Sequence, residues 1–99
     1  MRHPQSDNKT EHRRRRKQYL VDKEGGGCFF CGWNKCLGGL DFHHAVPSKK
    51  SFSIGPAIAD GKPMNEIEHE AVKCILVCRN CHAEIHHFGF NHVLARAEQ

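Results

Sequence analysis

Two pairs of cysteines share a spacing that suits a metal ion. Two residues separate Cys28 from Cys31, and two separate Cys78 from Cys81. This spacing lets both sulfurs of a pair reach one ion at about 2.3 Å, and two pairs complete a closed tetrahedral site. The sequence therefore predicts a structural zinc site. Two disulfides or a redox Cys-x-x-Cys are the alternatives, although a redox centre needs only one pair.

Two further cysteines, Cys36 and Cys74, lie outside these pairs. We interpret them as small core residues or free thiols. Cys36 also remains an alternative to one of the four ligands.

The histidines suggest a second metal site. His82 and His86 are four residues apart, so their rings lie on one face of a helix. His43 and His44 are adjacent, and neighbours on a strand project to opposite sides. One of them can be a third ligand while the other stays free. Three protein ligands leave positions for water and substrate, which is typical of catalytic sites, and a free histidine suits a general base. The alternatives are ordinary surface histidines, or His82 in a Cys₃His zinc site.

The elements that must position these residues belong to one small α+β domain, as expected for 99 residues. We predict a disordered N-terminus over 1–9, the domain over 10–90 and a C-terminal tail over 91–99. This tail is either a further turn of helix or a loose segment. Within the domain the patterns predict a helix over 10–24, a strand over 40–46, a loop over 48–63, a helix over 66–72, a strand over 74–78 and a helix over 80–88.

The N-terminal segment is strongly basic. Residues 1–20 hold seven Lys/Arg against two acidic residues, a net +5, whereas the rest of the chain carries eight against nine, a net −1. The densest run is Arg13, Arg14, Arg15, Arg16 and Lys17. This asymmetry predicts contacts with DNA phosphates, which position a protein without reading sequence. A solvated charge run is the alternative.

No stretch approaches the ~20 apolar residues that a membrane span needs. The first 20 residues lack the apolar core of a secretory signal. We therefore expect a cytoplasmic protein without a membrane partner, whose cysteines stay reduced.

Taken together, these residues resemble the HNH endonuclease family, most closely its small phage and bacterial members with a four-cysteine zinc. The resemblance covers residues 10–88 and rests on three segments: Cys28-x-x-Cys31, Leu40-Asp-Phe-His43-His44-Ala-Val-Pro47 and Leu76-Val-Cys78-Arg-Asn-Cys81-His82-Ala-Glu-Ile-His86. It implies a ββα-metal fold, with two zinc knuckles and a basic N-terminal helix, that hydrolyses DNA phosphodiester bonds.

The resemblance also implies the role of each residue. His43, His82 and His86 match the ligands of one catalytic divalent cation, and His44 matches the general base. The four paired cysteines match the structural Zn²⁺ site. The catalytic cation could be Mg²⁺, Mn²⁺, Ni²⁺ or Zn²⁺, and three imidazoles favour the transition metals.

The sequence departs from the family at one position, where Lys73 stands in place of the usual asparagine. An inactivated nuclease that serves as an adaptor is therefore an alternative, as is a non-catalytic zinc module that binds nucleic acid. An active monomer with one catalytic metal would nick one strand at a time. Double-strand cleavage would require a homodimer, a second binding event or a larger phage or restriction assembly.

Overall fold

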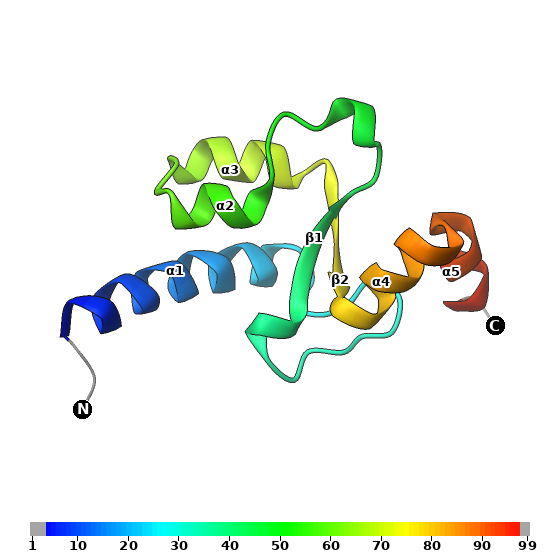
Figure 1. Ribbon diagram of the computed structural model, residues 1–99, viewed down its shortest axis with the longest axis horizontal. Helices are drawn as coiled ribbons and strands as arrows, with labels where there is room; N and C mark the ends of the chain where they lie inside the picture. Colours follow the sequence, from blue (N-terminus) through cyan, green and yellow to red (C-terminus); the bar gives the residue numbers. More distant parts are fainter. Residues whose placement is uncertain (1–3, 98–99) are drawn as a thin grey trace.

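The computed structural model describes residues 4–97, which form a small α+β fold around a two-stranded sheet (Figure 1). The predicted fold class, small α+β, is confirmed. In chain order the elements are α1 (Pro4–Lys23), the 3-10 helix η1 (Leu37–Gly39), β1 (Leu40–His44), the 3-10 helix η2 (Pro47–Lys49), α2 (Ile54–Ala59), α3 (Met64–Ala71), β2 (Cys74–Cys78), α4 (Arg79–Phe88) and α5 (Phe90–Ala97). Among the described residues, no helix has the length and apolar character to cross a membrane.

The sheet pairs β1 and β2 in antiparallel orientation, with Leu40 opposite Cys78 and His44 opposite Cys74. Helix α4 follows β2 directly, so strands and helix have the order β-β-α, with α2 and α3 inserted between the strands. Side chains alternate along β1. Asp41 and His43 therefore share one face, while Leu40 and His44 are buried on the other.

Helix α1 begins at Pro4, not near residue 10. The predicted disorder of residues 1–9 is therefore wrong for 4–9, and residues 1–3 lie outside the described part. Proline is tolerated in the first helical turn because its missing N–H has no intrahelical partner there. The predicted end is confirmed: Gly25 and Gly26 follow with φ of 101° and 78°, and the Gly26 N–H donates to the Val21 carbonyl at 2.8 Å.

The predicted loop over 48–63 contains α2, which packs beside α3 above the end of α1 (Figure 1). Its Ile54, Ala57 and Ile58 are buried in one apolar cluster with Ile67 of α3. Helix α3 begins at Met64, two residues before its predicted start, and follows Pro63. The predictions for β2 and α4 are confirmed, including Gly89 as the stop, with a φ of 100°.

Of the two alternatives for the tail over 91–99, a turn of helix or a loose segment, the structure shows a helix. Residues 90–97 form α5, and residues 98 and 99 lie outside the described part. Helix α5 packs on α4, and its Val93 is fully buried. Arg96 of α5 also pairs with Glu84 of α4. The C-terminus thus contributes to the core.

Buried side chains of the described residues form two clusters. The first lies between β2, α4, α5 and the cysteine pairs, and includes Val21, Leu76, Val77 and Val93. The second lies beneath α2 and α3. Because Leu20 belongs to the second cluster and Val21 to the first, the end of α1 packs against both.

Candidate metal centres and the pocket beside them

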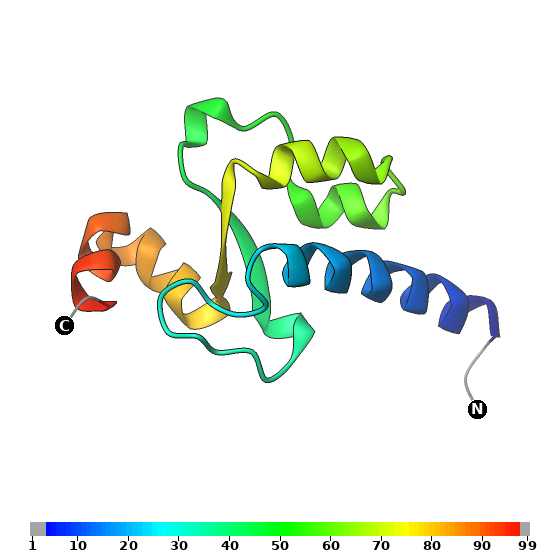
Figure 2. The ribbon, with the colours of Figure 1, turned by 180° about the vertical axis from the view of Figure 1, so that it is seen from behind.

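The four paired cysteines converge, with their sulfur atoms within 4.8 Å of one another. Figure 2 shows why: the segment after α1 runs beside the start of α4. The Phe29 N–H donates to the Leu76 carbonyl at 2.7 Å and holds this segment against β2. We call this cluster, Cys28, Cys31, Cys78 and Cys81, the cysteine centre.

The spacing of the cysteine centre fits a tetrahedral zinc. Sulfurs at 2.3 Å from one ion would lie about 3.8 Å apart. The Sγ of Cys31 lies 3.8 Å from that of Cys78 and 3.9 Å from that of Cys81. A disulfide needs about 2.05 Å, and all six cysteines of the chain are unpaired. The disulfide alternative therefore does not fit.

The surroundings of the cysteine centre favour a permanently bound ion. Cys28, Cys78 and Cys81 are at most 6% exposed, so water has little access. Burial raises the pKa of the Cys28 thiol, but hydrogen bonds from the backbone N–H groups of Cys78, Cys31 and Phe30 outweigh it and lower that pKa to about 7. The Cys81 N–H also donates to the Cys78 Sγ at 3.4 Å. Donors aimed at the Cys28 sulfur stabilise its thiolate, the form that binds zinc, whereas burial raises the pKa of Cys31 and Cys81.

A second cluster, the histidine centre, joins β1 to α4. One ring nitrogen each of His43, His82 and His86 lies within 4.8 Å of the others. The Nε2 atoms of His82 and His86 are 3.1 Å apart. Imidazole nitrogens around one ion would be separated by about 3.0 Å in octahedral and about 3.3 Å in tetrahedral geometry. The donor set therefore fits one divalent transition-metal ion.

Two residues that the sequence analysis did not single out support the histidine centre. The Nδ1 of His82 contacts a carboxylate oxygen of Asp41 at 3.2 Å, which orients Nε2 toward the other imidazoles. The ring of Phe90 in α5 stacks on His43, with 14° between the planes. Burial, followed by the nearby charges of His82 and His86, lowers the pKa of His43 and favours its neutral form.

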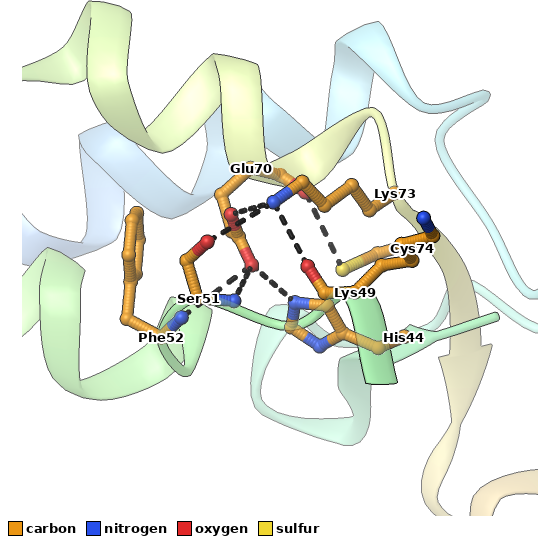
Figure 3. A network of polar contacts seen from close by, with 7 residues as sticks. All are labelled: His44, Lys49, Ser51, Phe52, Glu70, Lys73 and Cys74. Carbon is orange, nitrogen blue, oxygen red and sulfur yellow. Dashed lines mark hydrogen bonds and ion pairs between the residues drawn. The ribbon is translucent and has the colours of Figure 1, made fainter. Parts of the chain in front are cut away.

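His44 points away from the histidine centre, as the alternation along a strand predicts. It is 7% exposed, and its Nε2 lies 2.9 Å from Oε2 of Glu70 in α3 (Figure 3). Lys73 contacts the other oxygen of the same carboxylate at 2.8 Å. Glu70 is the third functional residue that sequence reasoning missed.

A pocket of about 760 Å³ lies between α1, β1 and α2. Both His44 and His82 line it, so the pocket reaches the histidine centre as well as the buried histidine. Arg13 and Lys17 of α1 line one wall, and Lys50 lines another. Burial lowers the pKa of Lys17, an effect that the Asp41 carboxylate partly offsets. Four Lys or Arg side chains and one carboxylate line the pocket beside largely apolar residues, and this net positive charge suits a polyanionic ligand.

The five basic residues Arg13–Lys17 face different surroundings in the structure. Arg13, Arg14 and Lys17 line the pocket, whereas Arg16 donates to the Lys62 carbonyl and ties α1 to the α2–α3 turn. Arg15 lies on the exposed surface near Glu11, at 3.9 Å. Five consecutive helical residues span more than a full turn, so they cannot all face one ligand.

The two remaining cysteines stay outside both centres. Cys74 is buried in the cluster beneath α3, where burial raises the pKa of its thiol to about 11. Cys36 is exposed and precedes η1. Neither belongs to a group of potential metal ligands among residues 4–97.

Comparisons with protein-family models, curated proteins and solved structures gave no significant match for this chain. The functional assignment therefore depends on the residues and their geometry.

Proposed function

We propose that this protein is a metal-dependent endonuclease of the HNH type that hydrolyses DNA phosphodiester bonds. One observation carries the proposal: the three converging imidazoles of His43, His82 and His86 adjoin a cationic pocket that also reaches His44. The order β1, β2, α4, with candidate ligands on the first strand and on the helix, supports a ββα-metal arrangement.

The two centres have different roles in this proposal, one structural and one catalytic. A closed four-thiolate site such as the cysteine centre has a structural role, and it holds the start of α4 in place. A divalent cation on the histidine centre would supply positive charge to a phosphate oxygen and to the leaving oxygen. His43, His82 and His86 hold that position, and Asp41 keeps His82 oriented through the contact at 3.2 Å.

The remaining residues bind the substrate and move a proton. Arg13, Arg14 and Lys17 contact backbone phosphates along the pocket and draw the strand toward β1. These contacts read no bases, so we expect low sequence specificity. His44 accepts a proton from the attacking water, the part of a general base. With one histidine centre per chain, each monomer nicks a single strand, and a homodimer or larger assembly is required to cut both.

The alternative is a zinc-stabilised module that binds nucleic acid without cleaving it. The burial of His44, only 7% exposed, favours this alternative because a general base must reach the attacking water. Catalytic contacts often tighten only when substrate is bound, so this burial does not rule out catalysis, and an activity assay separates the two functions.

The deciding experiment uses supercoiled plasmid, with protein that has been treated with a chelator and then supplied with Mg²⁺, Mn²⁺, Ni²⁺ or Zn²⁺. We expect nicking with at least one cation, and a loss of about 10²–10⁴-fold in the His44→Ala variant. Plasmid binding by this variant should match the wild type, because the α1 cations remain.

His87→Ala is the matched control, since His87 is an exposed neighbour on α4 outside the histidine centre. It should nick at the wild-type rate. Salt-sensitive plasmid binding without cleavage by any metal would favour the non-catalytic alternative. Full activity of His44→Ala would remove His44 from the mechanism.

A further inference from the structure

Glu70 is a buried carboxylate with an unusually complete set of donors. It is 2% exposed, and its Oε2 lies 2.8 Å from the Ser51 N–H nitrogen and 3.4 Å from that of Phe52. The same oxygen lies 2.9 Å from Nε2 of His44, and Oε1 accepts from the Lys73 ammonium at 2.8 Å (Figure 3). Three elements, β1, the loop before α2 and the end of α3, meet at this one group.

These contacts keep Glu70 ionised. The hydrogen bond from Lys73 is the main cause, and with the Ser51 amide and His44 it outweighs burial and lowers the pKa of Glu70 to about 2. An ionised carboxylate has no proton to donate. The His44 Nε2 must therefore carry the hydrogen of this contact, and its Nδ1 retains the lone pair in the neutral ring. In Figure 3 the second ring nitrogen of His44 lies on the side away from Glu70.

We propose that Glu70 is a positioning residue, which holds the His44 ring in its Nε2–H tautomer so that Nδ1 takes the proton in the reaction. This inference rests on the proposed nuclease function. As the new P–O bond forms, a proton of the attacking water moves to Nδ1. The P–O3′ bond breaks with its electron pair on the 3′ oxygen, which is protonated from solvent. The imidazolium that results is stabilised by the Glu70 carboxylate.

Lys73 contacts Glu70 and so acts on His44 only through that carboxylate. It occupies the position where the family resemblance expects an asparagine, and its ammonium contacts Glu70, the Lys49 carbonyl at 3.0 Å and the Ser51 hydroxyl at 3.2 Å. It thereby fixes the carboxylate against the loop before α2. The pair Lys73–Glu70 thus provides an orienting group for His44.

The test combines kinetics with an NMR measurement of the His44 ring. In Glu70→Gln we expect kcat for plasmid nicking to fall by about 10–100-fold, the usual cost of losing an orienting partner, with KM nearly unchanged. Glu70→Asp keeps the negative charge and should recover part of the rate. In long-range ¹H–¹⁵N spectra of the zinc-loaded protein, wild-type His44 should be the Nε2–H tautomer, and Glu70→Gln should show a mixture.

Ile67→Val is the control for a purely structural effect. Ile67 is fully buried on the same helix and belongs to the cluster beneath α2 and α3, so its truncation lowers stability without touching His44. It should retain the wild-type kcat at a temperature where both variants are folded. A loss of kcat in Ile67→Val equal to that in Glu70→Gln would overturn the positioning role.

Wild-type His44 in the Nδ1–H form would also overturn the proposal, and this result requires no variant to fold. The spectra do not depend on cleavage. If the wild-type protein nicks no plasmid, the nuclease proposal fails, and the tautomer alone then decides whether Glu70 orients His44.

Discussion

The two candidate metal centres use neighbouring residues of α4, Cys81 and His82, yet their environments differ sharply. The cysteine centre at the start of α4 is mostly buried, with three of its four sulfurs on residues at most 6% exposed. The histidine centre one turn later is half-exposed, and His86 faces solvent. The first donor set is complete, whereas the second has three ligands and adjoins a pocket. The difference supports the proposal that an ion at the cysteine centre would stabilise the fold and that an ion at the histidine centre would meet a substrate.

Removing a ligand of the cysteine centre should have the largest effect. Cys78 ends β2, caps α4 and supplies one of the four sulfurs. In Cys78→Ala we expect loss of the bound zinc and of the cooperative thermal transition, because structural zinc contributes folding free energy directly. Zinc content and circular dichroism measure this. Cys36→Ala, at an exposed cysteine outside the centre, is the control and should behave as wild type.

A change beside the histidine centre should weaken metal binding and leave the fold intact. In Asp41→Asn, His82 loses the carboxylate that orients it, and we expect about 10–100-fold weaker binding of Mn²⁺ or Zn²⁺ at this centre. Isothermal titration of protein that already carries its structural zinc gives the affinity. Loss of the cooperative thermal transition in Asp41→Asn, as expected for Cys78→Ala, would contradict the separation of the two centres.

The smallest effect concerns the cations along the pocket. Replacing both Arg13 and Lys17 by Gln should reduce the slope of log binding constant against log salt by about two, since each phosphate contact contributes about one. Arg15→Gln, on the same helix but outside the pocket, should leave the slope at the wild-type value. A loss of about one in Arg15→Gln, half that of the double variant, would mean that the whole basic run acts as a diffuse charge.

The sequence predicted the two groups of candidate metal ligands that the structure brings together, because the spacing within each pair is local. A Cys-x-x-Cys pair and two histidines four apart on a helix constrain geometry within a few residues. That His43 and His44 point to opposite sides follows from the alternation of a strand. Asp41 was also within reach, because it lies two residues before His43 and so shares its face.

Other features depend on tertiary packing. Helix α2 is six residues long and contains Gly55 and Pro56, which are typical of loops, and it is held by burial against α3. Helix α5 likewise owes its stability to Val93 in the core. Short helices are marginal alone and depend on such contacts.

Glu70 illustrates a signal that was present but not recognised. It lies on the same helical stripe as Ile67 and Ala71, both of them buried. A carboxylate on an apolar stripe is costly unless donors surround it, so its presence there predicts a partner. Which partner it has could not be predicted, because His44 and Ser51 approach from 26 and 19 residues away.

The most direct test of the account measures how many metal ions each chain binds, and compares that number with the fold and the nicking activity of the same sample. Mild chelation would first reduce the protein to one bound zinc, and native mass spectrometry would verify this number. Circular dichroism would then measure the fold of that sample, and a plasmid assay would measure its nicking activity. We predict that the one-zinc protein is folded and inactive, and that a second equivalent of Mn²⁺ or Zn²⁺ restores nicking in the wild type but not in His82→Ala. Full nicking with a single zinc bound, or failure of any second ion to bind, would contradict the account.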